Sequence, residues 1–228
     1  VIIDFSTLFD VKKIQRMLTI NLNILIRTFC LIFAFAYFTA EAAKFGDIIL
    51  AANAILLQFI HLLSFGLDGF AQAAETLVGG ALGENDRKKY RMAVKTTITW
   101  AFGISIIYSL GYWFFGSLMI DLFTNNDSVR IVANKAMIWV IILPLIAIWP
   151  YMLDGIFIGA TRSTDMRNGM ALSLVIFVIF TLVLEPNFGY HGLWVSLIIF
   201  MAARGLTLAA TYPNIEKNLK VVTVTNTN

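Results

Sequence analysis

The chain has 228 residues, of which 59% are hydrophobic and 14% are charged. Soluble domains carry about 25% charged residues, so the composition excludes a water-soluble globular protein and predicts a multi-pass membrane protein. The net charge of +3 does not indicate a nucleic-acid partner, because the basic residues stand in short clusters between apolar stretches that face membrane lipids.

The apolar stretches predict an all-α integral membrane protein built as a bundle of six transmembrane helices within residues 17–213. A spanning helix needs about 20 largely apolar residues. The expected helices lie at about 17–43, 47–82, 91–122, 128–160, 166–184 and 190–212. Residues 1–16 are expected to form an amphipathic linker, and residues 214–228 a cytoplasmic tail.

Prolines and glycines inside two of these helices predict irregular geometry. Pro144 and Pro150 are expected to break the fourth helix, since proline removes a backbone donor and its ring clashes with the preceding turn. Gly66 and Gly69 are positions at which the second helix can bend.

Basic residues predict the orientation of the bundle. They gather before the first helix, around Arg87 to Lys89 between the second and third, around Arg162 between the fourth and fifth, and after the sixth. These positions alternate with loops that hold few basic residues. Because positively charged loops remain in the cytoplasm, both termini are expected to be cytoplasmic.

Ionisable residues lie deep within the expected spans. They are Arg27, Asp68, Glu75, Asp154 and Arg204. A charge at this depth costs at least about 2.5–3.5 kcal/mol and is therefore expected to face protein, an ion or water. Counting about 1.5 Å per residue places Asp68 deepest, at roughly 22 Å, and the other four at about 12–15 Å. Both aspartates stand in Leu-Asp-Gly triplets.

Two interpretations of these charges remain open. Arg27, Glu75 and Arg204 are expected to form an intramembrane charge network that fixes helix packing, with Arg27 close to at least one carboxylate. Asp68 has no cation at its own depth, and Asp154 follows the segment that contains both prolines. These two aspartates are therefore the candidates for coupling to a proton or another cation.

Enzymatic signatures are missing from the sequence. It has no glycine loop of the phosphate-binding type, no histidine and cysteine set at metal-ligand spacing, and no plausible serine triad. We therefore expect neither an enzyme nor a protein with a metal or organic cofactor.

Several segments together resemble the multidrug and toxic compound extrusion (MATE) family, specifically its DinF-like branch. The segments that carry the resemblance are Leu50-Ala51-Ala52-Asn53-Ala54, Gly66-Leu67-Asp68-Gly69-Phe70-Ala71, Leu153-Asp154-Gly155-Ile156-Phe157-Ile158-Gly159-Ala160-Thr161-Arg162, Met166-Arg167-Asn168 and His191-Gly192-Leu193-Trp194. The resemblance runs from about residue 18 to residue 210.

The resemblance implies that the chain is the C-terminal lobe of a twelve-helix transporter in the bacterial inner membrane. Residues 1–16 would link it to an N-terminal six-helix lobe, expected upstream of Val1, which in many members carries the principal cation-coupling aspartate. Members of the family export small amphiphilic, often cationic compounds in exchange for protons or sodium ions, through a cleft between the lobes.

Two alternatives of other classes share this architecture. A flippase for lipids or polyprenyl-linked lipids also needs a hydrated groove within the membrane. A membrane scaffold without transport activity would instead pair every buried charge structurally.

Overall fold

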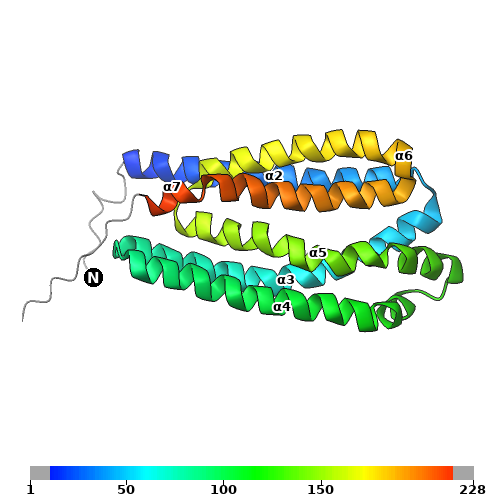
Figure 1. Ribbon diagram of the computed structural model, residues 1–228. Helices are drawn as coiled ribbons and strands as arrows, with labels where there is room; N and C mark the ends of the chain where they lie inside the picture. The colour runs from blue at the N-terminus through cyan, green and yellow to red at the C-terminus, as the bar shows by residue number, and fades with distance from the viewer. Residues whose placement is uncertain (1–10, 218–228) are drawn as a thin grey trace, which may run out of the picture.

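A computed structural model describes residues 11–217 (Figure 1). All regular secondary structure in this range is α-helical. The helices in chain order are α2 (Val11–Ala43), α3 (Asp47–Gly83), α4 (Arg87–Phe123), α5 (Asp127–Gly159), α6 (Ser163–Thr211) and the short α7 (Pro213–Glu216). The expected linker and tail lie largely outside the described residues.

Within the described part of the chain, five helices are long and apolar enough to cross a membrane. Six were expected. The fifth and sixth expected helices belong to one element, α6, which contains Pro186 and is non-helical at Gly189 (φ 56°, ψ −138°). The two parts of α6, yellow and orange in Figure 1, run side by side in opposite directions. Such a positive φ is accessible to glycine at little cost, and this lets the chain reverse within a single residue.

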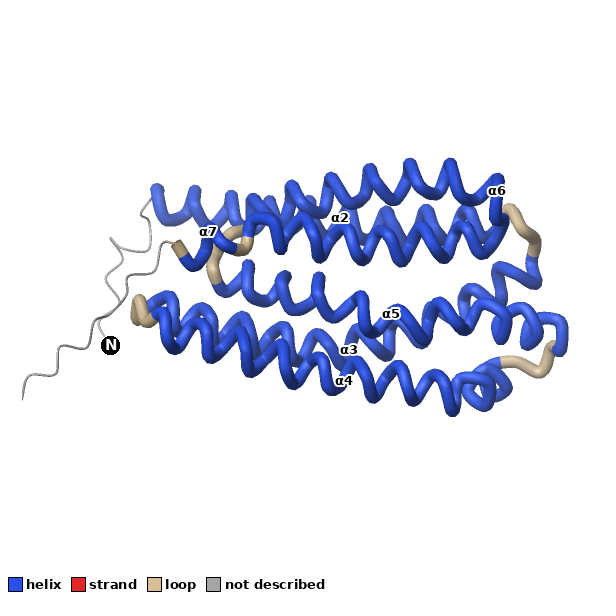
Figure 2. Tube along the Cα trace, viewed as in Figure 1, coloured by secondary structure: helices blue, strands red, loops and turns tan. Residues whose placement is uncertain are grey.

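The expectation that prolines break the fourth helix is wrong. Pro144 and Pro150 both lie inside α5, which continues from Asp127 to Gly159 (Figure 2). Both rings are buried among neighbouring helices. In a membrane bundle such neighbours can hold the helix together where proline removes a backbone hydrogen bond.

The second expected helix is likewise continuous, as α3. A methyl group added at Gly66 would lie 2.5 Å from Oη of Tyr108, whereas one added at Gly69 would meet no atom within 4 Å. The absence of a side chain at Gly66 therefore makes room for the Tyr108 side chain. Helix α3 continues through both glycines.

The helices form two groups with α5 between them. α3 and α4 pack against one side of α5, and α6 packs against it on the other, with α2 resting on α6 (Figure 1). Buried aromatic side chains fill the second group, such as Phe38 of α2 edge-on against Trp194 of α6 at 5.1 Å between ring centroids. Contact between α2 and α3 is sparse, and this is where the fold leaves room for a cavity.

Side-chain caps satisfy backbone N–H groups at the starts of α4 and α5. Asp86 accepts hydrogen bonds from the backbone N–H groups of Lys88 and Lys89, and Asn126 does the same for Ser128 and Val129. The start of α2, the α3–α4 turn, the α5–α6 turn and α7 all lie at one end of the bundle (Figure 1). The basic clusters singled out in the sequence therefore share that end.

Candidate functional site

A cavity of about 1210 Å³ lies between α2, α3, α5 and α6. It is lined by every ionisable residue that the sequence placed deep in the membrane, together with several other polar side chains. These residues are Arg27, Asp68, Glu75, Asp154 and Arg204, with His61, Ser64, Gln72 and Tyr151. Aliphatic and aromatic side chains complete the lining, so the cavity presents polar groups inside an apolar wall.

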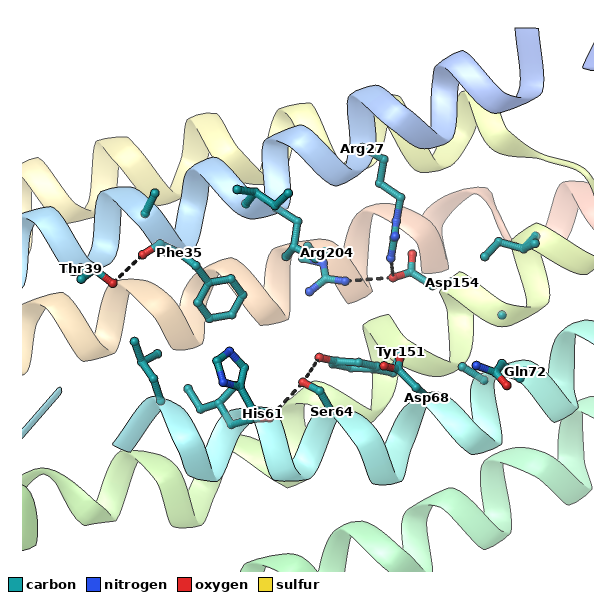
Figure 3. A pocket seen from close by; sticks show the side chains of 18 of the residues that line it. Arg27, Phe35, Thr39, His61, Ser64, Asp68, Gln72, Tyr151, Asp154 and Arg204 are labelled. Atoms are coloured by element: carbon teal, nitrogen blue, oxygen red, sulfur yellow. Dashed lines mark hydrogen bonds and ion pairs between the residues drawn. The ribbon is translucent and has the colours of Figure 1, made fainter. Parts of the chain in front are cut away.

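Asp154 of α5 holds two arginines from different helices (Figure 3). Its Oδ2 atom accepts a hydrogen bond from Nη2 of Arg27 on α2 and another, at 2.9 Å, from Nη2 of Arg204 on α6. Only 6% of Asp154 and 3% of Arg204 are exposed. The expectation that Arg27 lies close to a carboxylate is confirmed. Charge-assisted hydrogen bonds of this kind are the strong ones, so the triad joins three helices at one atom.

Arg204 is further supported by its neighbours on α5 and α6. Its Nη1 atom donates to Sδ of Met201 at 3.3 Å. Its Cζ atom lies 5.8 Å from the ring centroid of Tyr151 and 5.7 Å from that of Phe200, within the range of cation–π attraction. The aromatic faces therefore help to hold a guanidinium that is almost wholly removed from water.

The carboxylates of α3 have a different environment. Asp68 and Glu75 are seven residues apart and lie on one face of the helix. Among the residues that the structure describes, neither forms an ion pair within 4 Å. The expected network therefore includes Arg27 and Arg204 but does not bring in Glu75. Matching depth alone could not reveal this, because the cavity separates α3 from the helices that carry the arginines.

A hydroxyl pair lies beside Asp68 on the same side of the cavity (Figure 3). Ser64 donates to the backbone carbonyl of Ile60 at 2.9 Å, so the 2.5 Å contact between its Oγ and the Tyr151 hydroxyl is one in which the tyrosine donates. Sequence reasoning missed both residues. The available signal was their spacing, because Ser64 stands four residues before Asp68 and Tyr151 three residues before Asp154.

Close packing between α3 and α5 positions the Asp154 end of the cavity. A Cβ atom on Gly155 would lie 2.2 Å from the carbonyl oxygen of Ala71, and one on Gly159 would lie 2.5 Å from that of Glu75. Only glycine allows two backbones to approach so closely. Asp154 therefore projects from a segment of α5 that is pressed directly against α3.

In residues 11–217, no cluster of three or more histidine, cysteine, aspartate or glutamate side chains forms a candidate metal site. The cavity therefore offers single carboxylates and guanidiniums to whatever enters it.

Comparison with known proteins places this arrangement among membrane transporters. The MatE family model matches residues 24–186. DNA damage-inducible protein F of Escherichia coli is 36% identical over 198 residues, which cover 87% of this chain and 43% of that protein. Protein DETOXIFICATION 44, chloroplastic, of Arabidopsis thaliana is 26% identical over 182 residues, which cover 78% of this chain and 34% of that protein. The chain thus spans less than half the length of these relatives.

Solved structures share the fold. The MATE transporter VcmN of Vibrio cholerae, in its bent form, has a TM-score of 0.77 at 16% identity, covering 86% of this chain and 45% of that chain. A MATE protein in complex with MaL6 has a TM-score of 0.79 at 19% identity, covering 90% and 47%. The described bundle therefore has the fold of half a transporter of this kind.

Proposed function

Because the chain belongs to the MATE family, we propose that it is the C-terminal lobe of an antiporter that exports amphiphilic or cationic compounds in exchange for protons or sodium ions. The observation that carries the proposal is the cavity between α2, α3, α5 and α6, which holds ionisable side chains inside a membrane-spanning bundle. Intramembrane charges are costly and mark ion or substrate pathways.

Asp68 is the proposed coupling residue of this lobe. Asp154 already has two guanidiniums on one of its oxygens, and binding a proton or sodium ion there would compete with both. Asp68 lines the cavity without an ion pair to any described residue. A carboxylate in that position can take up and release a small cation without first breaking a buried contact.

Asp68, which has no ion pair to a described residue, disfavours a scaffold without transport activity, in which each intramembrane charge would be paired. A flippase is the competing transporter, so the substrate has to be tested directly. We further propose that the end of the bundle carrying the basic clusters faces the cytoplasm of a bacterial cell. We also propose that an N-terminal six-helix lobe faces this bundle and closes the open side of the cavity.

The test uses the full-length protein reconstituted in vesicles, with an imposed pH or sodium gradient and a fluorescent organic cation as the transported compound. We expect gradient-driven dye movement, and we expect Asp68→Asn to abolish the part that depends on the gradient because an amide cannot release a proton. Asp127→Asn is the matched control, since the Asp127 side chain is 88% exposed at the start of α5 and does not line the cavity.

Two results would contradict this assignment. If the vesicles translocate a labelled lipid but ignore the dye under every gradient, the protein is a flippase. If dye export is normal in Asp68→Asn, coupling does not pass through this residue.

A further inference from the structure

The cavity has walls of opposite charge. Arg27 and Arg204 approach it from α2 and α6, and Asp68 and Glu75 from α3 on the facing side. Figure 3 shows the two guanidiniums on one side of the space and Asp68 on the other. Opposite charges on facing walls of low dielectric constant focus the electric field in the space between them.

The arginine side carries an excess of positive charge. Both guanidiniums contact the same oxygen of Asp154, so that one carboxylate faces two cations. The Nε atoms of Arg27 and Arg204 are also buried without a hydrogen-bond partner among the described residues. A surplus guanidinium charge favours an added carboxylate, sulfonate or phosphate.

Arg27 is the member of the pair that a ligand can reach. Its side chain is 16% exposed and that of Arg204 is 3% exposed. Arg204 is also covered by the faces of Tyr151 and Phe200. We therefore expect Arg27 to make the direct contact and Arg204 to hold Asp154 in place.

The opposite wall favours a cation. Asp68 and Glu75 form no ion pair with any residue of the described range, and His61 and Gln72 beside them add polar groups. An organic cation without an anionic group is attracted to this wall but makes no favourable contact with Arg27. An anion without a cationic group is repelled by the two carboxylates. A molecule that carries both charges is attracted to both walls.

We propose that this cavity selects amphiphiles that carry an anionic group together with a cationic one, and that Arg27 is the residue that recognises the anionic group. The inference rests on the proposed function and narrows its substrate class. The volume of about 1210 Å³ exceeds the range of about 300–1,000 Å³ typical of small-molecule sites, so a large aromatic zwitterion can enter.

Rhodamine B and its ethyl ester provide the test, because they share one cationic fluorophore and differ only in a free carboxylate. Binding of each dye to purified full-length protein is measured by fluorescence anisotropy at neutral pH. We expect rhodamine B to bind about tenfold more tightly, the effect of one added charge-assisted contact.

Substitutions at Arg27 identify the source of the preference. Arg27→Gln should bring the two affinities within about twofold of each other, while Arg27→Lys, which keeps the charge, should retain most of the difference. Asp68→Asn should weaken both dyes equally, because both carry the cation. Lys95→Gln is the charge-matched control, since Lys95 is exposed on α4, outside the cavity lining.

Equal affinities in the unmodified protein would overturn the inference, as would a preference that survives in Arg27→Gln. Export of the ester would still support the proposed function in either case. Conversely, a preference for rhodamine B that depends on Arg27, in a protein that moves neither dye under any gradient, would support the inference and contradict the proposed function.

Discussion

The two Leu-Asp-Gly triplets, at residues 67–69 on α3 and 153–155 on α5, have the same sequence and opposite surroundings. Asp154 is buried against two arginines, whereas Asp68 faces the cavity without an ion pair to a described residue. The glycines differ in the same sense, since Gly155 touches the backbone of α3 and Gly69 faces open space. The same short motif can thus hold helices together in one place and present a carboxylate to a cavity in another.

The largest expected difference is between the two glycines. We expect Gly155→Leu to prevent folding, because its Cβ would lie 2.2 Å from the rigid backbone oxygen of Ala71, a worse case than overpackings that cost about 1–3 kcal/mol. Gly69→Leu meets no atom within 4 Å at its Cβ and is the matched control. The measurement is the yield of monodisperse full-length protein by size-exclusion chromatography. Normal yield of Gly155→Leu would show that α3 and α5 can separate.

A second difference concerns the aspartates. Asp154→Asn is expected to lower stability by about 3–5 kcal/mol, since it leaves the buried Arg204 and the partly buried Arg27 without a counter-charge, while Asp68→Asn should change stability little. Thermal unfolding of the purified protein, followed by tryptophan fluorescence, checks both. Adding Arg27→Gln to Asp154→Asn should recover part of the loss, because it removes one of the unpaired charges. An additive loss in the double variant would contradict the triad.

The smallest effect is expected at the hydroxyl pair beside Asp68. Tyr151→Phe should cost about 1 kcal/mol, the usual net value of one hydrogen bond. In a Ser64→Ala background the same substitution should cost less, because its partner is already gone. The same thermal assay measures this difference, and equal losses in both backgrounds would mean that the two hydroxyls act independently.

Much of the architecture could be predicted along the chain. Long apolar runs with few charges can cross a membrane only as helices, because every backbone polar group must find its partner within the segment. This is why most of the expected helices closely match α2 to α5. The intramembrane charged residues could also be identified from the sequence, because the free-energy cost of burying a charge in the bilayer depends on its depth, and depth follows from position along the helix.

Helix interruptions were predicted less well. Pro144 and Pro150 are tolerated inside α5, whereas the interruption expected between residues 184 and 190 contains Gly189, where the chain reverses. Whether a proline ends a helix depends on what packs around the missing hydrogen bond, and this is information that the local sequence does not contain.

Depth along a helix follows from counting residues, so the sequence by itself determined that this is an all-α membrane protein with arginines and carboxylates at similar levels. Only the tertiary structure decided which of them meet. Arg27 and Asp154 are 127 residues apart, and Arg204 and Asp154 are 50 apart, while Glu75 at the same expected depth stays on the far side of the cavity. The reason is geometric, because counting residues gives only the depth of a side chain along the membrane normal. Its lateral position depends on how the helices pack, for example at Gly155, where the absence of a side chain lets α5 approach α3 closely.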